Sequence, residues 1–249
     1  MEWIEPDWPA RPWVRAVCTT RAGGFSQGPF ASLNLADHVG DDPSCVGRNR
    51  AVLSDRLALP HAPLWLRQVH GCDVARGGLD STGCEADAAT ATGPGAVCAV
   101  LTADCLPLLL CDRAGTRVAA VHAGWRGLAA GVIEAAVARL QVAHQDLLAW
   151  FGPAIGPDAF EVGEDVRAVL LAADPAAGAA FRPSPRGRWL ADLDLLARRR
   201  LEALGVGQVW GGGYCTFKDA GRFFSYRRDG VTGRMATLIW LTPGPAHAG

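Results

Sequence analysis

The sequence predicts an α/β fold in one domain, with strands and helices interleaved along the chain. Two short apolar runs, 106–110 and 118–121, are bounded by Gly and Asp and are typical of buried strands. Apolar residues at helical spacing follow them over 129–140. No internal repeat, charge run or linker divides the 249 residues, so we expect a single domain over 1–249.

The composition is that of a globular protein with an ample core, with 49% hydrophobic and 20% charged residues. Lys and Arg total 24 against 25 acidic residues, so no strong charge indicates a nucleic-acid partner or an acidic membrane surface. No run reaches the roughly 18 apolar residues of a membrane span. Eight cysteines without a CxxC pair indicate reduced thiols, and residues 1–13 lack the pattern of a signal peptide. We therefore expect a cytoplasmic protein.

In the first half of the chain, strands alternate with one helix. Residues 13–20 are rich in Val, Trp and Thr, which predicts a strand, and a Gly-rich loop follows over 21–28. That loop fits either an anion cradle with Arg21 or a plain turn between strands. Asp41-Asp42-Pro43 is a helix start signal, and the helix should end before Pro60. Further strands are expected at 63–69, which ends at His70, and at 96–102.

The second half continues the alternation. If 106–110 and 118–121 pair as antiparallel strands, Cys105 and His122 lie at the same end of the sheet. The stretch 174–188 is rich in Pro, Ala and Arg, which predicts a mobile surface loop. The remaining elements are strands at 147–151, 208–210 and 235–241, helices at 164–172 and 193–204, the second capped by Asp192, and a frayed tail at 243–249.

Three potential metal ligands stand at or near the ends of predicted strands: His70, Cys105 and His122. Imidazole nitrogen and thiolate sulfur suit a borderline-soft divalent ion, of which zinc is the usual one, and a three-residue set leaves a fourth position open. Taken singly, each residue also fits a buried thiol or a hydrogen-bonded structural histidine. Glu85 and Asp87 fit either carboxylates that orient a metal-bound histidine or a solvated turn. Copper is disfavoured, because the six histidines are too few and too scattered for a multicopper centre.

Several segments resemble the laccase-domain family, whose members are also described as polyphenol oxidases, peptidoglycan editing factors and purine nucleoside phosphorylases. They are TTRAGGFSQGPFASLNLADHVGDD (19–42), QVHG (68–71), TADCLPLLLCD (102–112), AAVHAGWRGLAAGV (119–132), GPAIGP (152–157), FEVGEDV (160–166) and FFSYRRDGVTGRMATLIWL (223–241). The resemblance covers nearly the whole chain. It implies a fold of layered mixed β-sheets flanked by helices, similar to that of some cysteine hydrolases.

The resemblance also implies a reaction and the residues for it. The implied activities are zinc-dependent phosphorolysis of adenosine, inosine, guanosine and methylthioadenosine, and deamination of adenosine. Zinc would be bound by His70, Cys105 and His122, and the catalytic residues would be Cys105, His122 and Arg21. Arg21, with help from Arg126 or Arg227, could hold phosphate bidentately. Purine nucleosides and phosphate are therefore the expected partners.

Two other functions stay open. Cys105 and His122 could act as the nucleophile and base of a metal-free hydrolase. One of the family's descriptions suggests an enzyme that edits a peptidoglycan precursor. The chain departs from the family at 158–160, where members often carry a cysteine and an aromatic residue and this sequence has Asp158-Ala159-Phe160. The sequence does not decide the preferred nucleoside, the oligomeric state, or the general acid and base.

Overall fold

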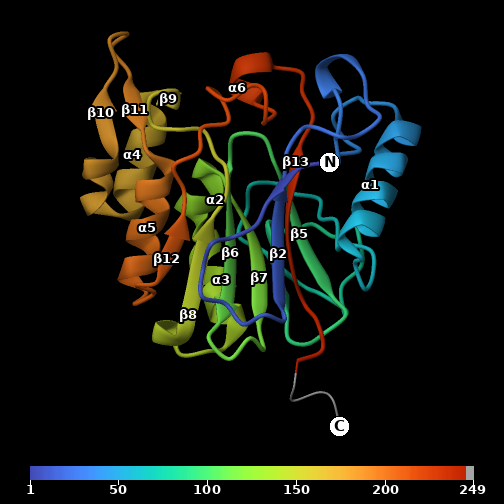
Figure 1. The fold of residues 1–249 in the computed structure, drawn as a ribbon. Helices are drawn as coiled ribbons and strands as arrows, with labels where there is room; N and C mark the ends of the chain where they lie inside the picture. Colours follow the sequence, from blue (N-terminus) through green and yellow to red (C-terminus); the bar gives the residue numbers. More distant parts are fainter. Residues whose placement is uncertain (245–249) are drawn as a thin grey trace.

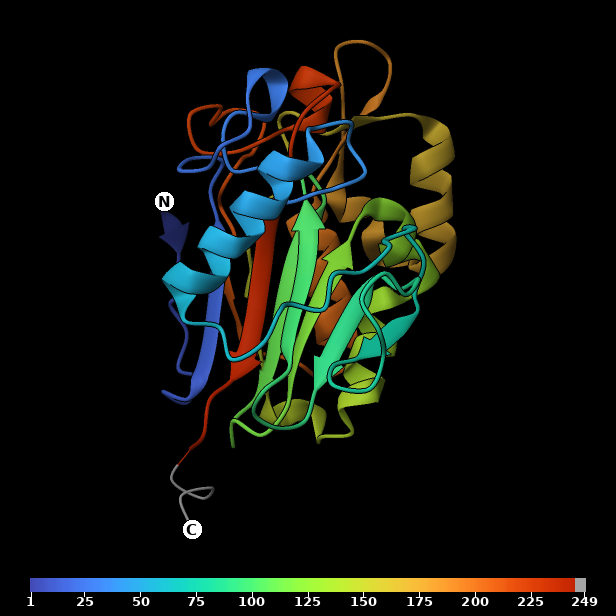
Figure 2. The same ribbon diagram turned by 90° about the vertical axis from the view of Figure 1, so that its right-hand side faces the viewer.

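Two β-sheets pack face to face in the computed structural model, which describes residues 1–244, and helices cover the outer face of each sheet (Figure 1). The result is a four-layer arrangement of helix, sheet, sheet and helices. Figure 2 shows the first helix lying across the smaller sheet, with the helices between residues 125 and 203 on the far side of the larger one. The structure therefore confirms the predicted α/β fold with layered mixed sheets.

The smaller sheet has four antiparallel strands, with the last strand of the chain in its interior. Met235 pairs with Thr102 on one side of that strand, and Leu238 pairs with Val17 on the other. The two ends of the chain therefore meet in one sheet. In spatial order, the strands are β1 (Trp3–Ile4), β2 (Val14–Thr19), β13 (Met235–Leu241) and β5 (Val97–Thr102).

The larger sheet has six strands and is mixed. Its outer pairs, β12 with β8 and β3 with β4, are parallel, and the inner pairs are antiparallel. In spatial order, the strands are β12 (Val209–Gly211), β8 (Leu147–Phe151), β6 (Leu106–Asp112), β7 (Val118–Ala123), β4 (Ala88–Ala91) and β3 (Val74–Arg76).

Strand β6 shows why the apolar runs of this sequence are continuous. Leu108 and Leu110 face the cluster under the helices, whereas Leu109 and Cys111 face the cluster between the two sheets. Side chains alternate across a strand, so a strand that is covered on both faces needs apolar residues at every position. All seven residues of β6 are buried.

Helix α1 (Pro43–Leu57) covers the smaller sheet and begins at Asp42, whose carboxylate accepts a hydrogen bond from the Ser44 backbone N–H at 2.8 Å. The other helices pack on the larger sheet or follow its strands. They are α2 (Trp125–Ala130), α3 (Val132–Leu140), α4 (Glu164–Ala173), α5 (Leu193–Ala203) and the short α6 (Tyr226–Asp229), with 3₁₀ turns η1 (Gly28–Phe30), η2 (His144–Asp146) and η3 (Pro175–Ala180). As predicted, Asp192 caps α5 through the backbone N–H of Leu195.

The prediction of a loop over 174–188 is wrong. The segment forms η3, then β10 (Phe181–Pro183) and a turn into β11 (Trp189–Ala191), and β11 also pairs with β9 (Glu161–Val162). This three-stranded sheet stands apart from the two large ones at the upper left of Figure 1. Its strands are only two or three residues long, too short for a recognisable alternation of apolar side chains.

The prediction of a strand at 63–69 is also wrong, because the segment is extended but does not form a continuous ladder. The segment makes only isolated bridges, Leu64 with Cys98 and Arg67 with Glu85. The Gln68 side chain replaces a ladder by bonding both backbone groups of Leu101, at 2.7 and 2.9 Å. In addition, the helix expected over 129–140 is split by Gly131, whose φ of 89° is left-handed and separates α2 from α3.

The C-terminal tail and the membrane-spanning potential of the helices can also be compared with the sequence predictions. The tail predicted at 243–249 falls mostly outside the described residues, which end at Gly244, and Gly244 itself is buried against the Trp13 indole. Among residues 1–244, no helix has the length and apolar character needed to cross a membrane.

Replacing Leu109 by alanine should lower the free energy of unfolding by about 2–5 kcal/mol, because a fully buried leucine leaves a cavity between two packed sheets. Urea unfolding followed by circular dichroism measures the change. The matched control is Leu79→Ala, because Leu79 is 73% exposed and its loss should cost within about 0.5 kcal/mol. Equal effects of the two substitutions would contradict the placement of β6 between the layers.

Candidate metal-binding pocket

Strand pairing brings Cys105 and His122 to one end of the larger sheet. Cys105 directly precedes β6, and His122 in β7 lies opposite Pro107 in the antiparallel register. The prediction that the two residues share an end of the sheet is therefore confirmed. His70 reaches the same place from the extended segment that ends beside β5.

The corner that carries Cys105 is held by the residue before it. Asp104 has a φ of 95°, an uncommon backbone conformation for a residue other than glycine. Its carboxylate accepts hydrogen bonds from the Thr216 hydroxyl and the Arg227 backbone N–H, both at 2.6 Å, and its carbonyl accepts one from Ile155 N–H at 2.8 Å. Three distant segments thus hold the turn between β5 and β6, and with it the direction of the thiol.

The three potential ligand atoms lie within 4.8 Å of one another. The Cys105 sulfur is 3.9 Å from Nε2 of His70, and the imidazole rings of His70 and His122 meet edge to face at a centroid distance of 4.8 Å. Gly124 leaves the space beside them open, because a Cβ at that position would lie 2.9 Å from the Cys105 sulfur and 3.0 Å from the His70 ring. Two imidazoles and a thiolate around an open position form a donor set that fits a zinc-like ion.

Asp87 lies beneath these ligands with no exposed surface. One carboxylate oxygen accepts hydrogen bonds from the His70 backbone N–H at 2.9 Å and from Nδ1 of His122 at 2.8 Å. The other accepts bonds from the N–H groups of Val69 and Gly71, at 3.1 and 2.7 Å. Burial acts to raise the pKa of Asp87, but these hydrogen bonds and the charge of His122 hold it below its usual value.

Asp87 therefore orients a histidine, as one of the two readings of this stretch predicted, and it is not part of a solvated turn. The bond to Nδ1 leaves Nε2 of His122 directed at the cluster. Glu85 has no such role, because its carboxylate is exposed and pairs with Arg67.

Mutual electrostatics set the protonation of the thiol and the imidazole. Burial would raise the pKa of Cys105, but the charge of His122 and hydrogen bonds from His122 and His70 outweigh it and lower the pKa to about 6. Burial would likewise lower the pKa of His122, yet the Cys105 thiolate and the Asp87 carboxylate raise it to about 9. Without a metal, the two side chains at neutral pH are therefore a thiolate and an imidazolium.

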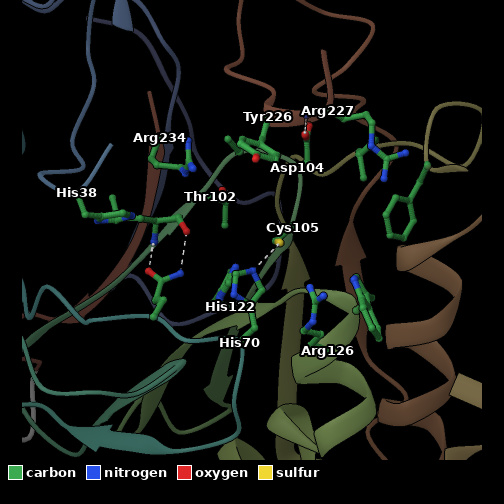
Figure 3. Close-up of a pocket in the computed structure, with 16 residues that line it drawn as sticks. His38, His70, Thr102, Asp104, Cys105, His122, Arg126, Tyr226, Arg227 and Arg234 are labelled. Carbon is green, nitrogen blue, oxygen red and sulfur yellow. Dashed lines mark hydrogen bonds between the residues drawn. The ribbon is translucent and has the colours of Figure 1, made fainter. Parts of the chain in front are cut away.

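A cavity of about 540 Å³ opens over the three ligands, within the size range of small-molecule sites. Figure 3 draws Arg126 and Arg227 on one side of the cluster and His38 and Arg234 on the other. Arg126 stacks on the Trp125 ring, and Arg227 lies over Phe160. The full lining is His38, Gln68, His70, Leu101, Thr102, Ala103, Asp104, Cys105, His122, Trp125, Arg126, Ile155, Phe160, Tyr226, Arg227 and Arg234.

Arg21 is the one expected site residue that does not line this cavity. Its Nε donates to the Ala31 carbonyl and its Nη1 to the Ala220 carbonyl, both at 3.0 Å, and its guanidinium lies over the Phe224 ring. These bonds tie the Gly-rich loop to the segment before α6. The geometry thus gives Arg21 a structural role, and a phosphate contact by Arg21 stays a prediction without geometric support.

Sequence reasoning missed several lining residues, among them the aromatic Trp125 and Phe160 and the polar His38, Thr102, Tyr226 and Arg234. Arg234 was hidden because all but one of the 24 basic residues are arginines, which makes any single arginine uninformative. His38 and Tyr226 stand in loop-like stretches with no second functional residue at a telling spacing. Thr102 is the last residue of a strand, and its proximity to Cys105 in the chain was the only available signal.

The fold and the pocket together define a layered α/β domain with an open His–Cys–His metal-binding group at one end of its sheets. The chain belongs to the family described as multi-copper polyphenol oxidoreductase laccase, whose pattern matches residues 15–242. This finding confirms the family resemblance of the sequence.

Individual relatives carry a more specific name. The chain is 57% identical to purine nucleoside phosphorylase PA4543 of Pseudomonas aeruginosa, over 96% of this chain and 98% of that protein. It is 52% identical to purine nucleoside phosphorylase YfiH of Escherichia coli, with the same coverage. The crystal structure of Neisseria meningitidis protein NMB0706 is similar with a TM-score of 0.94 and 48% identity, covering 98% of this chain and 100% of that one.

Replacing Asp87 by asparagine should weaken metal binding roughly 10- to 100-fold, because the carboxylate that orients both histidines would be lost. Competition with a chromogenic chelator measures the affinity for zinc. Glu85→Gln is the matched control, since it removes a nearby carboxylate that touches neither histidine. Equal zinc affinities in the two variants would show that Asp87 does not orient the ligands.

In metal-free protein, alkylation of Cys105 by iodoacetamide should rise with pH through about 6 and then level off, because the thiolate is the reactive form. Peptide mass spectrometry resolves each cysteine separately. Cys84 provides the comparison, because burial and Asp80 raise the pKa of its thiol and its alkylation should still increase where that of Cys105 is level. A Cys105 profile that follows Cys84 would contradict the thiolate–imidazolium pair.

Proposed function

We propose that this protein is a zinc-dependent purine nucleoside phosphorylase that also deaminates adenosine. Relatives at 46–57% identity over nearly the full chain are named purine nucleoside phosphorylases, which supports an enzyme acting on nucleosides and phosphate. The deaminase activity and the choice of zinc rest on the family resemblance and on the chemistry of the donor set.

The observation that carries the proposal is the composition of the cavity over the three ligands. Its walls combine aromatic rings, Trp125, Phe160 and Tyr226, with arginine side chains on both sides of the cluster. Aromatic faces suit a purine ring, and guanidinium groups suit phosphate oxygens. A nucleoside and a phosphate are the two reactants that a phosphorylase must hold together.

The residues present fit zinc by donor type, number and an open position. A bound zinc ion supplies a Lewis acid and lowers the pKa of a coordinated water to about 7. The chain's own part is to fix the ligands: Asp87 orients His122 and His70, and Asp104 fixes the corner that carries Cys105. Arg126 and Arg227, which the sequence made candidates for binding the anionic reactant, line the wall that carries Trp125 and Phe160.

A metal-free Cys–His hydrolase is the second candidate. It is favoured by the lowered pKa of Cys105 beside a charged His122, which is how a thiol nucleophile is activated. A thiol nucleophile needs only the Cys105–His122 pair, whereas a third potential ligand atom, Nε2 of His70, lies 3.9 Å from the sulfur. The third ligand therefore favours the metal-dependent reaction.

Incubated with inosine, the protein should release hypoxanthine and ribose 1-phosphate only when phosphate is present. It should convert adenosine to inosine without phosphate, because water supplies that nucleophile. Chromatography of the products measures both reactions. Elemental analysis should find one zinc per chain, chelation should abolish both activities, and added zinc should restore them.

His122→Ala should lose phosphorylase and deaminase activity together, because we assign both reactions to the same His–Cys–His metal-binding group. Cys45→Ser is the control for a cysteine outside the pocket, on the partly exposed face of α1. Full activity in chelated protein would favour the thiol hydrolase. Cleavage of a peptidoglycan precursor with all nucleosides untouched would make the nucleoside assignment wrong.

A further inference from the structure

Arg234 offers hydrogen-bond donors that no acceptor among residues 1–244 uses. It directly precedes β13, lines the cavity and is half-buried. Its Nη1 donates to the carbonyls of Thr232 and Gly233, at 2.9 and 3.0 Å. Within residues 1–244, neither Nε nor Nη2 has an acceptor, although a guanidinium carries five N–H donors.

Arg234 forms no direct ion pair in the described chain, although the negative charges of Cys105 and Asp104 are near enough to favour its charged form. Some half-buried arginines pair with carboxylates, as Arg228 does with Asp229 at 2.8 Å and Arg200 with Glu134 at 3.1 Å, whereas Arg21 and Arg198 bond only to backbone carbonyls. No carboxylate of the described chain forms an ion pair with Arg234. Burial lowers its pKa, but a guanidinium starts so high that it keeps its charge at neutral pH. A partly desolvated cation with no directly bonded carboxylate is stabilised further when an anion binds to its free N–H groups.

Thr102 is a second unsatisfied group on the same wall. Its side chain is 2% exposed, and its hydroxyl has no hydrogen-bond partner in the described chain. Thr102 pairs with Met235, the residue after Arg234, in the β5–β13 ladder. In the view of Figure 3, Thr102 stands between Arg234 and the Cys105 sulfur. A buried hydroxyl without a hydrogen-bond partner is destabilising, so a ligand atom that bonds to Thr102 would offset that cost.

On the opposite wall of the cavity, the arginine side chains contact aromatic rings. Arg227 donates from Nη1 to the Glu161 carbonyl at 2.8 Å and lies over Phe160, and Arg126 is stacked on Trp125. That wall presents aromatic faces as well as charge. The wall with Arg234 presents two unsatisfied polar groups and the imidazole of His38.

We propose that Arg234, together with Thr102 and His38, forms the phosphate subsite of this pocket. The guanidinium binds phosphate oxygens through Nε and Nη2 in the bidentate manner of Arg–phosphate pairs, and the Thr102 hydroxyl donates to a third oxygen. The purine then lies on the far side of the ligand cluster, against Trp125 and Phe160. This inference rests on the proposed function and replaces Arg21, Arg126 and Arg227 as the phosphate contacts.

The phosphate group has two possible sources, free inorganic phosphate or the phosphate ester of a nucleoside monophosphate. Equilibrium dialysis with radiolabelled inorganic phosphate, without nucleoside, tests the first source. A parallel dialysis with adenosine 5′-monophosphate tests the second. The purified, metal-loaded protein is used in both arms.

Arg234→Gln should weaken phosphate binding by about tenfold or more, because a charge-assisted bidentate contact is lost. Thr102→Val keeps the side-chain shape, removes only the hydroxyl and should weaken binding by about fivefold. In steady-state phosphorolysis of inosine, the same variants should raise KM for phosphate more than KM for inosine. Arg15→Gln is the matched control, because it removes an exposed positive charge on β2 and should bind phosphate like the parent protein.

Thermal melts separate loss of binding from loss of folding, and Thr102→Val covers the case in which Arg234→Gln fails to fold. The proposal is overturned if Arg234→Gln and Thr102→Val both bind phosphate like the parent protein. It is also overturned if Arg126→Gln abolishes phosphate binding while the Arg234 and Thr102 variants retain it. If Arg234→Gln weakens binding of adenosine 5′-monophosphate more than binding of inorganic phosphate, the phosphate ester is the ligand. The role of Arg234 in binding the phosphate co-substrate is then overturned. If phosphate binding depends on Arg234 but inosine stays intact, the subsite stands and the proposed function fails.

Discussion

The carboxylate of Asp87 is the interaction on which the site depends. It has no exposed surface, yet its two oxygens receive four hydrogen bonds from three successive backbone N–H groups and one imidazole. A buried carboxylate is tolerated only with such a set of donors. The bonds hold His70 in a left-handed conformation, with a φ of 62°, and fix the ring of His122. Two histidines from distant segments are thus positioned by one side chain.

The layers of the fold place that carboxylate. Asp87 precedes β4, and the β4–β7 register sets its carbonyl opposite the backbone N–H of His122, at 2.7 Å. β4 and β7 are buried throughout, so a one-residue slip would exchange the side chains facing the sheet cluster with those facing the helix cluster. Asp104 has the matching role where the chain crosses from the smaller sheet to the larger. The metal-binding group therefore lies where the two sheets meet, fixed from both.

Sequence reasoning succeeded where one physical signal dominates. Strands β8 and β13 match their predicted ranges because doubly covered strands require uninterrupted apolar runs. It failed where side chains replace the backbone ladder, as Gln68 does at Leu101, and where strands are too short to alternate, as at 181–191. The ligand set could be foreseen from residue chemistry at strand ends. The wall with Arg234 could not be foreseen, because free N–H donors on an arginine are recognised only from the atoms that surround it in the fold.

The charges of the cluster decide between its two chemistries. Asp87 and Cys105 bring two negative charges, which a divalent ion would balance once His122 gives up its proton. Without the ion, the imidazolium of His122 balances only one of them. A lowered thiol pKa therefore accompanies both a metal site and a thiol nucleophile and cannot separate them. The position of His70 distinguishes them. Asp87 accepts two further hydrogen bonds, from the N–H groups of Val69 and Gly71, and these hold the loop that places a third potential ligand beside the sulfur. A dyad of Cys105 and His122 requires no third donor atom at the sulfur, whereas a metal site does.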